Sequence, residues 1–449
     1  MSAKATSERM LLSGGWVLSM DPAIGDLPCG DVLVEGERIV AVGPKLEVGD
    51  ALRIDMRDRI VLPGFVDTHR HTWQTCVRHR YADIDPAIYF REMLGAKGAA
   101  CTTEDVYIGT LLGALSALDG GITTMLDWAH VQNTPEHADA AIEALGDAGI
   151  RGVFAHGWPL VDGASWMFDS TREHPADIRR LRTRYFASDD QLLTLAMAAR
   201  GPEMARREAW LADLRTAREL GIRSSIHMGA YARNAVRAVA AMHETGALGD
   251  DLTFVHCCHC HDDEIAMMAD AGVSASLGVH CELNAQGIGD IPLDRLLAVG
   301  IRPSLSGDTE TKCAGDMFTQ MRHAFAYYRS WMGGGHSRAQ GAPGTITCRD
   351  VLEFATLAGA KANGLEAKVG SLTPGKQADI VAVRTTDLNL APVSDPVGAL
   401  VLAAHPGNVE SVFVAGRAVK RDGRLLHVDL EAVRQRALAS QQRIMGYPA

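Results

Sequence analysis

The feature that most constrains the fold is a repeated alternation of short apolar segments and helical segments between residues 63 and about 370. The apolar segments have the length and composition of buried strands, and stretches with helical periodicity follow them. This alternation favours a parallel sheet with crossover helices, and about eight such units fit a closed barrel. The expected strands are Gly64–Thr68, Thr123–Asp127, Gly152–His156, Ser224–His227, Thr253–His256, Val273–Leu277 and Pro303–Gly307, and the expected helices include Glu203–Leu220.

Both ends of the chain have a different, β-rich pattern. Short apolar segments separated by Gly, Asp and Pro occur at Val32–Val34 and Ile39–Val42, and again at Asp379–Val383 and Val409–Val414. Two β-rich ends around a different middle suggest one small domain built from both termini. We therefore predict an α/β fold in which residues 63–371 form a (β/α)8 TIM barrel and residues 1–62 and 372–449 form a small β-sandwich.

Composition excludes several classes of protein. The chain has 449 residues, and its 47% apolar and 22% charged content is that of an ordinary globular protein. The 44 basic and 55 acidic residues give a net charge of −11, so we expect no nucleic-acid partner. No apolar run reaches the roughly 18 residues of a membrane span. The polar N-terminus does not resemble a signal peptide, and nine cysteines, an odd number, fit a reducing compartment. We expect a cytoplasmic protein.

Metal-suited side chains stand at the ends of several expected strands. The segment PGFVDTHRH ends in His69 and His71, and residues two apart in a strand point to the same face. His227 closes a later strand, His256 closes the next one, and Asp308 follows the last. The carboxyl ends of barrel strands share one face, so these groups should meet. Imidazole and carboxylate ligands are suited to a divalent metal ion with one position open for catalysis.

As a set, these segments resemble the amidohydrolase superfamily, and within it the branch of cytosine-deaminase-like enzymes, adenosylhomocysteine deaminases and triazine hydrolases. The resemblance covers nearly the whole chain and implies a barrel flanked by a small β-sandwich. The segments that carry it are PGFVDTHRH (63–71), GITTMLD (121–127), VHCCHCHDDEI (255–265), LSGD (305–308) and GSLTPGKQADIVAV (370–383).

The resemblance also implies roles for individual residues. The metal ligands would be His69, His71, His227 and Asp308. Asp308 would in addition take a proton from the water on the metal, and His256 would hydrogen-bond that water or the substrate, so these two are the expected catalytic residues.

Two departures from the superfamily bear on the reaction. Binuclear members use a carbamylated lysine on a central strand, but no lysine lies between Lys97 and Lys312. We therefore expect one divalent ion, zinc in the first place, with iron or manganese as alternatives. Deaminases of this branch usually carry His-x-x-Glu after the fifth strand, and the glutamate protonates a ring nitrogen. Here Ala230 stands in the place of that glutamate.

The alanine leaves the reaction open. A replacement acid could come from His259, Glu282 or Glu310. We nevertheless predict negligible deamination of guanine, cytosine or adenosine-type substrates. A reaction that needs no ring protonation would remain, such as amide or lactam hydrolysis or a metal-assisted elimination.

Four further residues are candidates for substrate binding. Trp73 and Gln74 follow His71 directly, so an aromatic ring and an amide should lie near the metal, where they could stack on a planar substrate and read its edge. Arg78, in a short basic run, could receive a carboxylate. Glu282 lies one strand beyond His256.

These observations support three hypotheses. The first is a mononuclear metal-dependent hydrolase that attacks a C–N bond of a small cyclic or aromatic substrate, in an amide, lactam or amidine, with metal-bound hydroxide. The second is a metal-dependent lyase or a C–C or C–O-cleaving enzyme on the same scaffold. The third, a non-enzymatic binding protein, is disfavoured because every ligand position is filled. The expected partner is a small-molecule substrate, with no membrane, and we expect a homo-oligomer.

Overall fold

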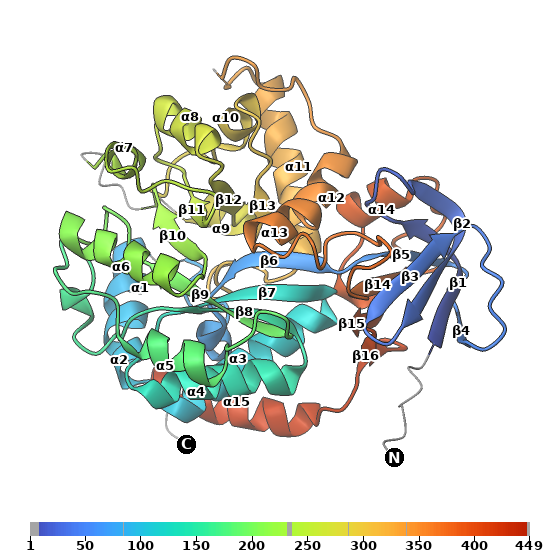
Figure 1. The fold of residues 1–449 in the computed structure, drawn as a ribbon, viewed down its shortest axis with the longest axis horizontal. Coiled ribbons are helices and arrows are strands. Elements are labelled where there is room, and N and C mark those ends of the chain that lie inside the picture. Colours follow the sequence, from blue (N-terminus) through green and yellow to red (C-terminus); the bar gives the residue numbers. More distant parts are fainter. Residues whose placement is uncertain (1–8, 84, 231–235, 286, 338, 447–449) are drawn as a thin grey trace.

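The computed structural model describes residues 9–83, 85–230, 236–285, 287–337 and 339–446 (Figure 1). Eight of its strands pair in sequence order, and every one of these pairings is parallel. They are β6 (Phe65–Arg70), β7 (Ile122–Ala129), β8 (Arg151–His156), β9 (Leu193–Ala199), β10 (Ser224–Met228), β11 (Leu252–His256), β12 (Ser274–Leu277) and β13 (Ser304–Leu305).

Contacts between the first and last of these strands close the sheet into a barrel. The hydroxyl oxygens of Thr68 on β6 and Ser304 on β13 lie 2.9 Å apart. Beyond β13, the Asp308 N–H donates to the His69 carbonyl at 2.9 Å, and the His71 N–H donates to the Asp308 carbonyl at 2.9 Å. The predicted α/β barrel is confirmed. Strand β9 is an addition, because the sequence analysis did not identify it.

Helices follow the strands and surround the barrel (Figure 1). Those of the barrel region are η1 (Thr72–Val77), α1 (Pro86–Arg91), η2 (Glu92–Lys97), α2 (Gly98–Ala100), α3 (Thr103–Asp119), α4 (Pro135–Ala148), η3 (Gly163–Ser165), α5 (Asp177–Arg184), α6 (Arg207–Glu219), α7 (Ala238–Glu244), α8 (Asp262–Asp270), α9 (Val279–Asn284), α10 (Leu293–Ala298), α11 (Met317–Gly333), α12 (Cys348–Phe354) and α13 (Leu357–Ala362).

Local sequence explains these elements. All eight residues of β7 are buried, because a strand of a parallel barrel is covered on both faces and needs no alternation of polar and apolar residues. Helix α4 begins with Pro135, whose missing N–H costs nothing in the first turn. It ends at Gly149, which adopts φ +71°, a left-handed conformation that glycine reaches without strain.

The two ends of the chain form a separate mixed sheet beside the barrel (Figure 1). Strand β5 pairs antiparallel with β14, with Pro63 opposite Ile380. This mixed sheet of both termini is as predicted, while the boundaries at residues 62 and 372 stay predictions. Its elements are β1 (Arg9–Leu18), β2 (Asp26–Glu35), β3 (Arg38–Gly43), β4 (Leu52–Asp55), β5 (Arg59–Pro63), β14 (Ile380–Arg384), β15 (Val409–Val414), β16 (Arg417–Arg421) and β17 (Arg424–Leu425), with α14 (Pro396–Leu402) and η4 (Pro406–Asn408) between them.

The last helix, α15 (Leu430–Met445), leaves this sheet and packs against the barrel helix α3. Ser440 Oγ donates to Asp105 Oδ1 at 2.7 Å, and Arg443 donates to the same oxygen at 2.6 Å. Helix α15 is therefore anchored on the barrel. None of the described helices is long and apolar enough to cross a membrane.

Candidate active site

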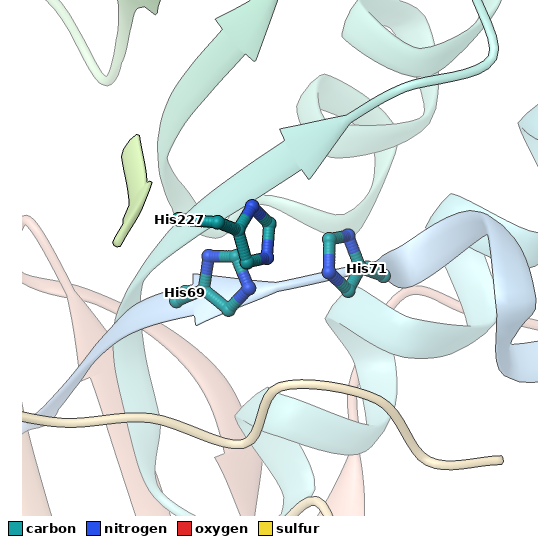
Figure 2. A group of neighbouring side chains, drawn as sticks. All are labelled: His69, His71 and His227. Atoms are coloured by element: carbon teal, nitrogen blue, oxygen red, sulfur yellow. The ribbon is translucent and has the colours of Figure 1, made fainter. Parts of the chain in front are cut away.

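Four metal-suited side chains converge at the carboxyl ends of the barrel strands. His69 lies on β6, His71 directly follows it, His227 lies on β10 and Asp308 follows β13. Figure 2 shows the three imidazoles facing one another, and one ring nitrogen from each lies within 4.8 Å of the others. The Nε2 atoms of His69 and His71 each lie 3.5 Å from Asp308 Oδ1. The structure thus brings together the four ligands that the sequence predicts.

The backbone beside these ligands is fixed by a buried ion pair. Arg70, between the two histidines, donates from Nε to Asp67 Oδ2 at 2.9 Å, and both side chains are buried. Asp67 Oδ1 accepts the Gly307 N–H at 3.1 Å, next to Asp308. Asp308 itself has φ +50°, a conformation that costs free energy for residues other than glycine and often marks functional positions. The carboxylate is therefore held by its neighbours rather than by local preference.

The protonation states suit metal binding. His71 Nδ1 lies 3.1 Å from the Trp128 carbonyl, which fixes the N–H on Nδ1 and leaves Nε2 as the ligand atom. Burial lowers the pKa of His71 to about 3, so the ring is neutral, as a ligand must be. Burial opposes ionisation of Asp308, but the imidazole of His69, 3.5 Å away, and the other neighbouring histidines hold its pKa well below its usual range.

A metal ion would satisfy groups that the protein itself leaves unsatisfied. Neither ring nitrogen of the buried His69 makes a hydrogen bond within the described part of the chain. Buried polar atoms without a partner are rare and call for an explanation. Three imidazoles and one carboxylate form a donor set typical of zinc and of divalent iron, with room for a further ligand. The residues present therefore fit a single divalent ion.

His256 lies beside this cluster and is held by a buried carboxylate. Its Nδ1 lies 3.0 Å from Glu282 Oε1, and its Nε2 lies 4.0 Å from Asp308 Oδ2. Glu282 also accepts the Gly278 N–H at 2.9 Å. Burial opposes protonation of His256, but the hydrogen bond to Glu282 and the charge of Asp308 raise its pKa above the ordinary value. The ring is thus oriented with Nε2 toward the metal side.

A cavity of about 510 Å³ opens in front of these groups. Its wall is mostly aromatic and aliphatic, with Asp85 and Lys312 as charged residues besides Asp308. Such a wall suits a planar, largely apolar molecule. The lining residues are His71, Asp85, Tyr89, Phe90, Leu94, Trp128, His130, Trp158, Met167, Phe168, Met204, His227, Ala230, His256, Cys281, Ala285, Gly287, Ile288, Asp308, Thr309 and Lys312.

The four predicted substrate-binding residues are not among those that line this cavity. Trp73 donates from Nε1 to His130 Nδ1 at 3.0 Å. Gln74 donates to the Tyr89 hydroxyl at 2.8 Å and accepts from the Thr309 hydroxyl at 2.7 Å.

Trp73 and Gln74 therefore support the wall, and their contact with a substrate stays a prediction. Arg78 donates from Nε to Glu310 at 3.0 Å, and Glu282 binds His256. Contact of either residue with a substrate also stays a prediction.

Comparison with known proteins assigns the chain to a protein family. Residues 60–419 match the Amidohydrolase family. The chain belongs to this family. A 5-methylthioadenosine/S-adenosylhomocysteine deaminase of Symbiobacterium thermophilum is 31% identical over 432 residues, which cover 92% of this chain and 94% of the relative. A 5'-deoxyadenosine deaminase of Methanosarcina barkeri is 27% identical over 453 residues, which cover 97% and 98%. Like these members, the protein is an enzyme of the class that hydrolyses non-peptide C–N bonds.

Solved amidohydrolase structures share the whole fold. An adenosine deaminase from Xanthomonas campestris with bound zinc superposes with a TM-score of 0.86 at 23% identity and covers 97% of this chain and 98% of its own. A variant of atrazine chlorohydrolase from Arthrobacter aurescens, complexed with zinc and atraton, gives 0.83 at 22% identity, covering 96% and 100%. At these identities the likeness establishes the architecture, with the mixed sheet of both termini included.

The region around Ala230 holds a carboxyl group that the sequence analysis missed. Ala230 lines the cavity, and Glu203, in the loop after β9, accepts the neighbouring Gly229 N–H at 2.8 Å. The signal in the sequence that could have identified Glu203 is its position just after β9, a strand that was not recognised. The three acids considered from the sequence are engaged elsewhere. His259 Nε2 lies 3.1 Å from the Gly287 carbonyl, Glu310 binds Arg78 and Glu282 binds His256.

Proposed function

We propose that this amidohydrolase is a mononuclear metal-dependent hydrolase that cleaves a C–N bond in an amidine, lactam or amide of a small cyclic or aromatic substrate. The observation that carries the proposal is the cluster of three histidines and one carboxylate beside an aromatic cavity. We propose zinc as the ion, because the donor set suits it and two structures of the same fold carry zinc.

In the proposed reaction His69, His71, His227 and Asp308 would hold the ion. A divalent ion lowers the pKa of a water and makes hydroxide available near neutral pH. Asp308 Oδ2, on the side that faces His256 at 4.0 Å, accepts the proton that the water gives up. His256, fixed by Glu282, donates from Nε2 to the oxygen on which negative charge develops.

The cavity supports a planar ring as the substrate. Trp128 and Trp158 pack edge to face at 5.2 Å and both line the wall, so a flat apolar ring finds matching surface there. Relatives named as deaminases of adenosine derivatives support an amino-substituted aromatic ring. Lys312 and Asp85 are charged and would select among polar substituents. A lyase reaction was motivated by Ala230 alone, and none of the relatives described above favours it.

Metal content and the reaction products test the proposal. Elemental analysis of the purified protein should find about one zinc per chain, and light scattering tests the expected homo-oligomer. A screen of amidines, aminopurine nucleosides, lactams and amides, read by mass spectrometry in water enriched in heavy oxygen, should give one product that carries the label. Ammonia or an amine should be released from all of these except a lactam, whose ring opens and keeps the amine. A product without label would point to elimination and overturn the proposal.

A further inference from the structure

The carboxyl group of Glu203 lies beside Ala230, a residue that lines the cavity. Strand β9 ends at Ala199, and the chain then brings Glu203 against the turn that follows the neighbouring strand β10. Glu203 Oε2 accepts the Gly229 N–H at 2.8 Å, and the adjacent Ala230 amide also acts on the carboxyl group. Glu203 is only 4% exposed, and both Met204 and Ala230 line the cavity.

At position 229 the turn that receives this carboxyl group has no room for a side chain. Gly229 adopts φ +59°, and a Cβ atom added there would lie 2.9 Å from the Cys260 nitrogen. Residue 230 carries only a methyl group. The amides of this turn therefore present donors to an acid from outside the turn, and Glu203 is the acid that meets them.

Neighbouring buried carboxylates are committed to other partners. Glu282 binds His256, Glu310 binds two arginines, and Glu264 accepts N–H groups at the starts of α7 and α8. In contrast, no arginine or lysine among the described residues pairs with Glu203. A buried carboxyl group without a cation beside it is a candidate for proton transfer rather than for structural pairing.

We infer that Glu203 is the proton donor of this active site and takes the place that Ala230 leaves without an acid. The inference rests on the proposed hydrolysis of a C–N bond. Glu203 gives its proton to a nitrogen of the scissile unit while the hydroxyl group from water adds to the carbon. The carboxylate recovers a proton from that hydroxyl group as the carbonyl forms, and the first proton of the water, taken up by Asp308, leaves with the nitrogen as ammonia or an amine.

The electrostatic surroundings agree with this role. Burial raises the pKa of Glu203 to about 7, although the Gly229 and Ala230 amides and the charge of His256 act in the opposite direction. The charge of Glu264 raises it further. A group with this pKa still holds its proton in part of the molecules at neutral pH, which is the condition for a general acid.

The variants Glu203→Gln and Glu203→Gln/Ala230→Glu test the inference. The glutamine can still accept the Gly229 N–H through its amide oxygen, so a purely structural role predicts little change. Proton donation predicts a fall in kcat of about 10²–10⁴-fold with metal content unchanged, and recovery of at least about tenfold when a carboxyl group is supplied at position 230. A kcat within about threefold of wild type would overturn the inference.

Two readouts on the wild-type protein do not depend on how the variants fold. Its kcat/KM should fall as the pH rises through about 7. In metal-loaded protein with carbon-13-labelled glutamate, one carboxyl resonance, absent from Glu203→Gln, should titrate near the same pH; titration at the ordinary value near 4.5 would reject the proton donor. An inactive wild-type protein in which this carboxyl group still titrates high would count against the proposed reaction and not against Glu203.

Discussion

The two sides of the cavity are built in opposite ways. On the metal side, His69 and His71 stand two residues apart at the end of one strand, and Asp308 exchanges backbone hydrogen bonds with both. On the acid side, Glu203 comes from the loop after β9, and its carboxyl group meets the backbone amides of the turn after β10. The metal side is fixed by strand geometry, whereas the acid side depends on how two loops pack. A carboxyl group can therefore be supplied from a different strand while the ligand cluster stays in place.

The largest expected effect comes from breaking the metal side. His69→Ala removes a buried ligand, and we expect loss of bound metal and a fall in kcat/KM of more than about 10⁴-fold, beyond what one acid or base contributes. Elemental analysis and steady-state kinetics measure both. His156→Ala is the matched control, because His156 also ends a barrel strand but pairs with His174 at 2.9 Å. Equal metal loss in both variants would contradict the assigned ligand set.

The second prediction concerns His256, which faces both the metal ligands and Glu282. His256→Ala should lower kcat by about 10²–10⁴-fold while the metal stays bound. Glu282→Gln should cost less, about tenfold, because the ring remains but loses its charged partner. If His256→Ala released the metal, His256 would belong to the ligand set instead.

The third prediction concerns stability on the acid side, and its sign is opposite to that of activity. The pKa of Glu203 is raised from 4.5 to about 7, so the folded state holds this proton more tightly than the unfolded state does. The free energy of unfolding therefore falls as the pH rises from about 4.5 to about 7, and the whole loss is present above about pH 7. A shift of this size corresponds to roughly 3 kcal/mol at most. Glu203→Gln should therefore be more stable than wild type at about pH 8, by about 1–3 kcal/mol, with little difference below about pH 4.5. Denaturant unfolding at both pH values measures it, and a variant less stable at pH 8 would refute the raised pKa.

The smallest effect is expected far from the cavity. Arg443→Ala removes the contact of α15 with the buried Asp105 and should cost about 1 kcal/mol of unfolding free energy without changing kcat. Arg434→Ala, on the same helix, breaks an exposed pair with Glu431 and should cost almost nothing. Together they give the baseline for contacts outside the site, and a loss of activity in either would link α15 to the cavity.

The sequence predicts the metal side of the cavity more fully than the acid side. The meeting of His69, His71, His227 and Asp308 could be predicted because each lies at or just beyond the end of a strand that is apolar and bounded by turn residues. Strand β9 was missed because its segment, LTLAMAA, is rich in Leu, Ala and Met, which favour helices over strands. As a result, Glu203 was included in the expected helix Glu203–Leu220, whereas α6 begins only at Arg207. Part of the cavity wall was equally out of reach, since Phe90 and Phe168 come together there through tertiary packing alone.

The pairing of β5 with β14 has a consequence for how the protein is made. Strand β5 runs directly into the first barrel strand, yet its partner leaves the ribosome only after the whole barrel has been synthesised. Until then one edge of β5 lies open, and an open edge can pair with another chain. Contacts between segments so distant in sequence also form slowly, because a long loop must close first. The nascent chain therefore depends on protection from aggregation for longer than a barrel with its own complete sheet would.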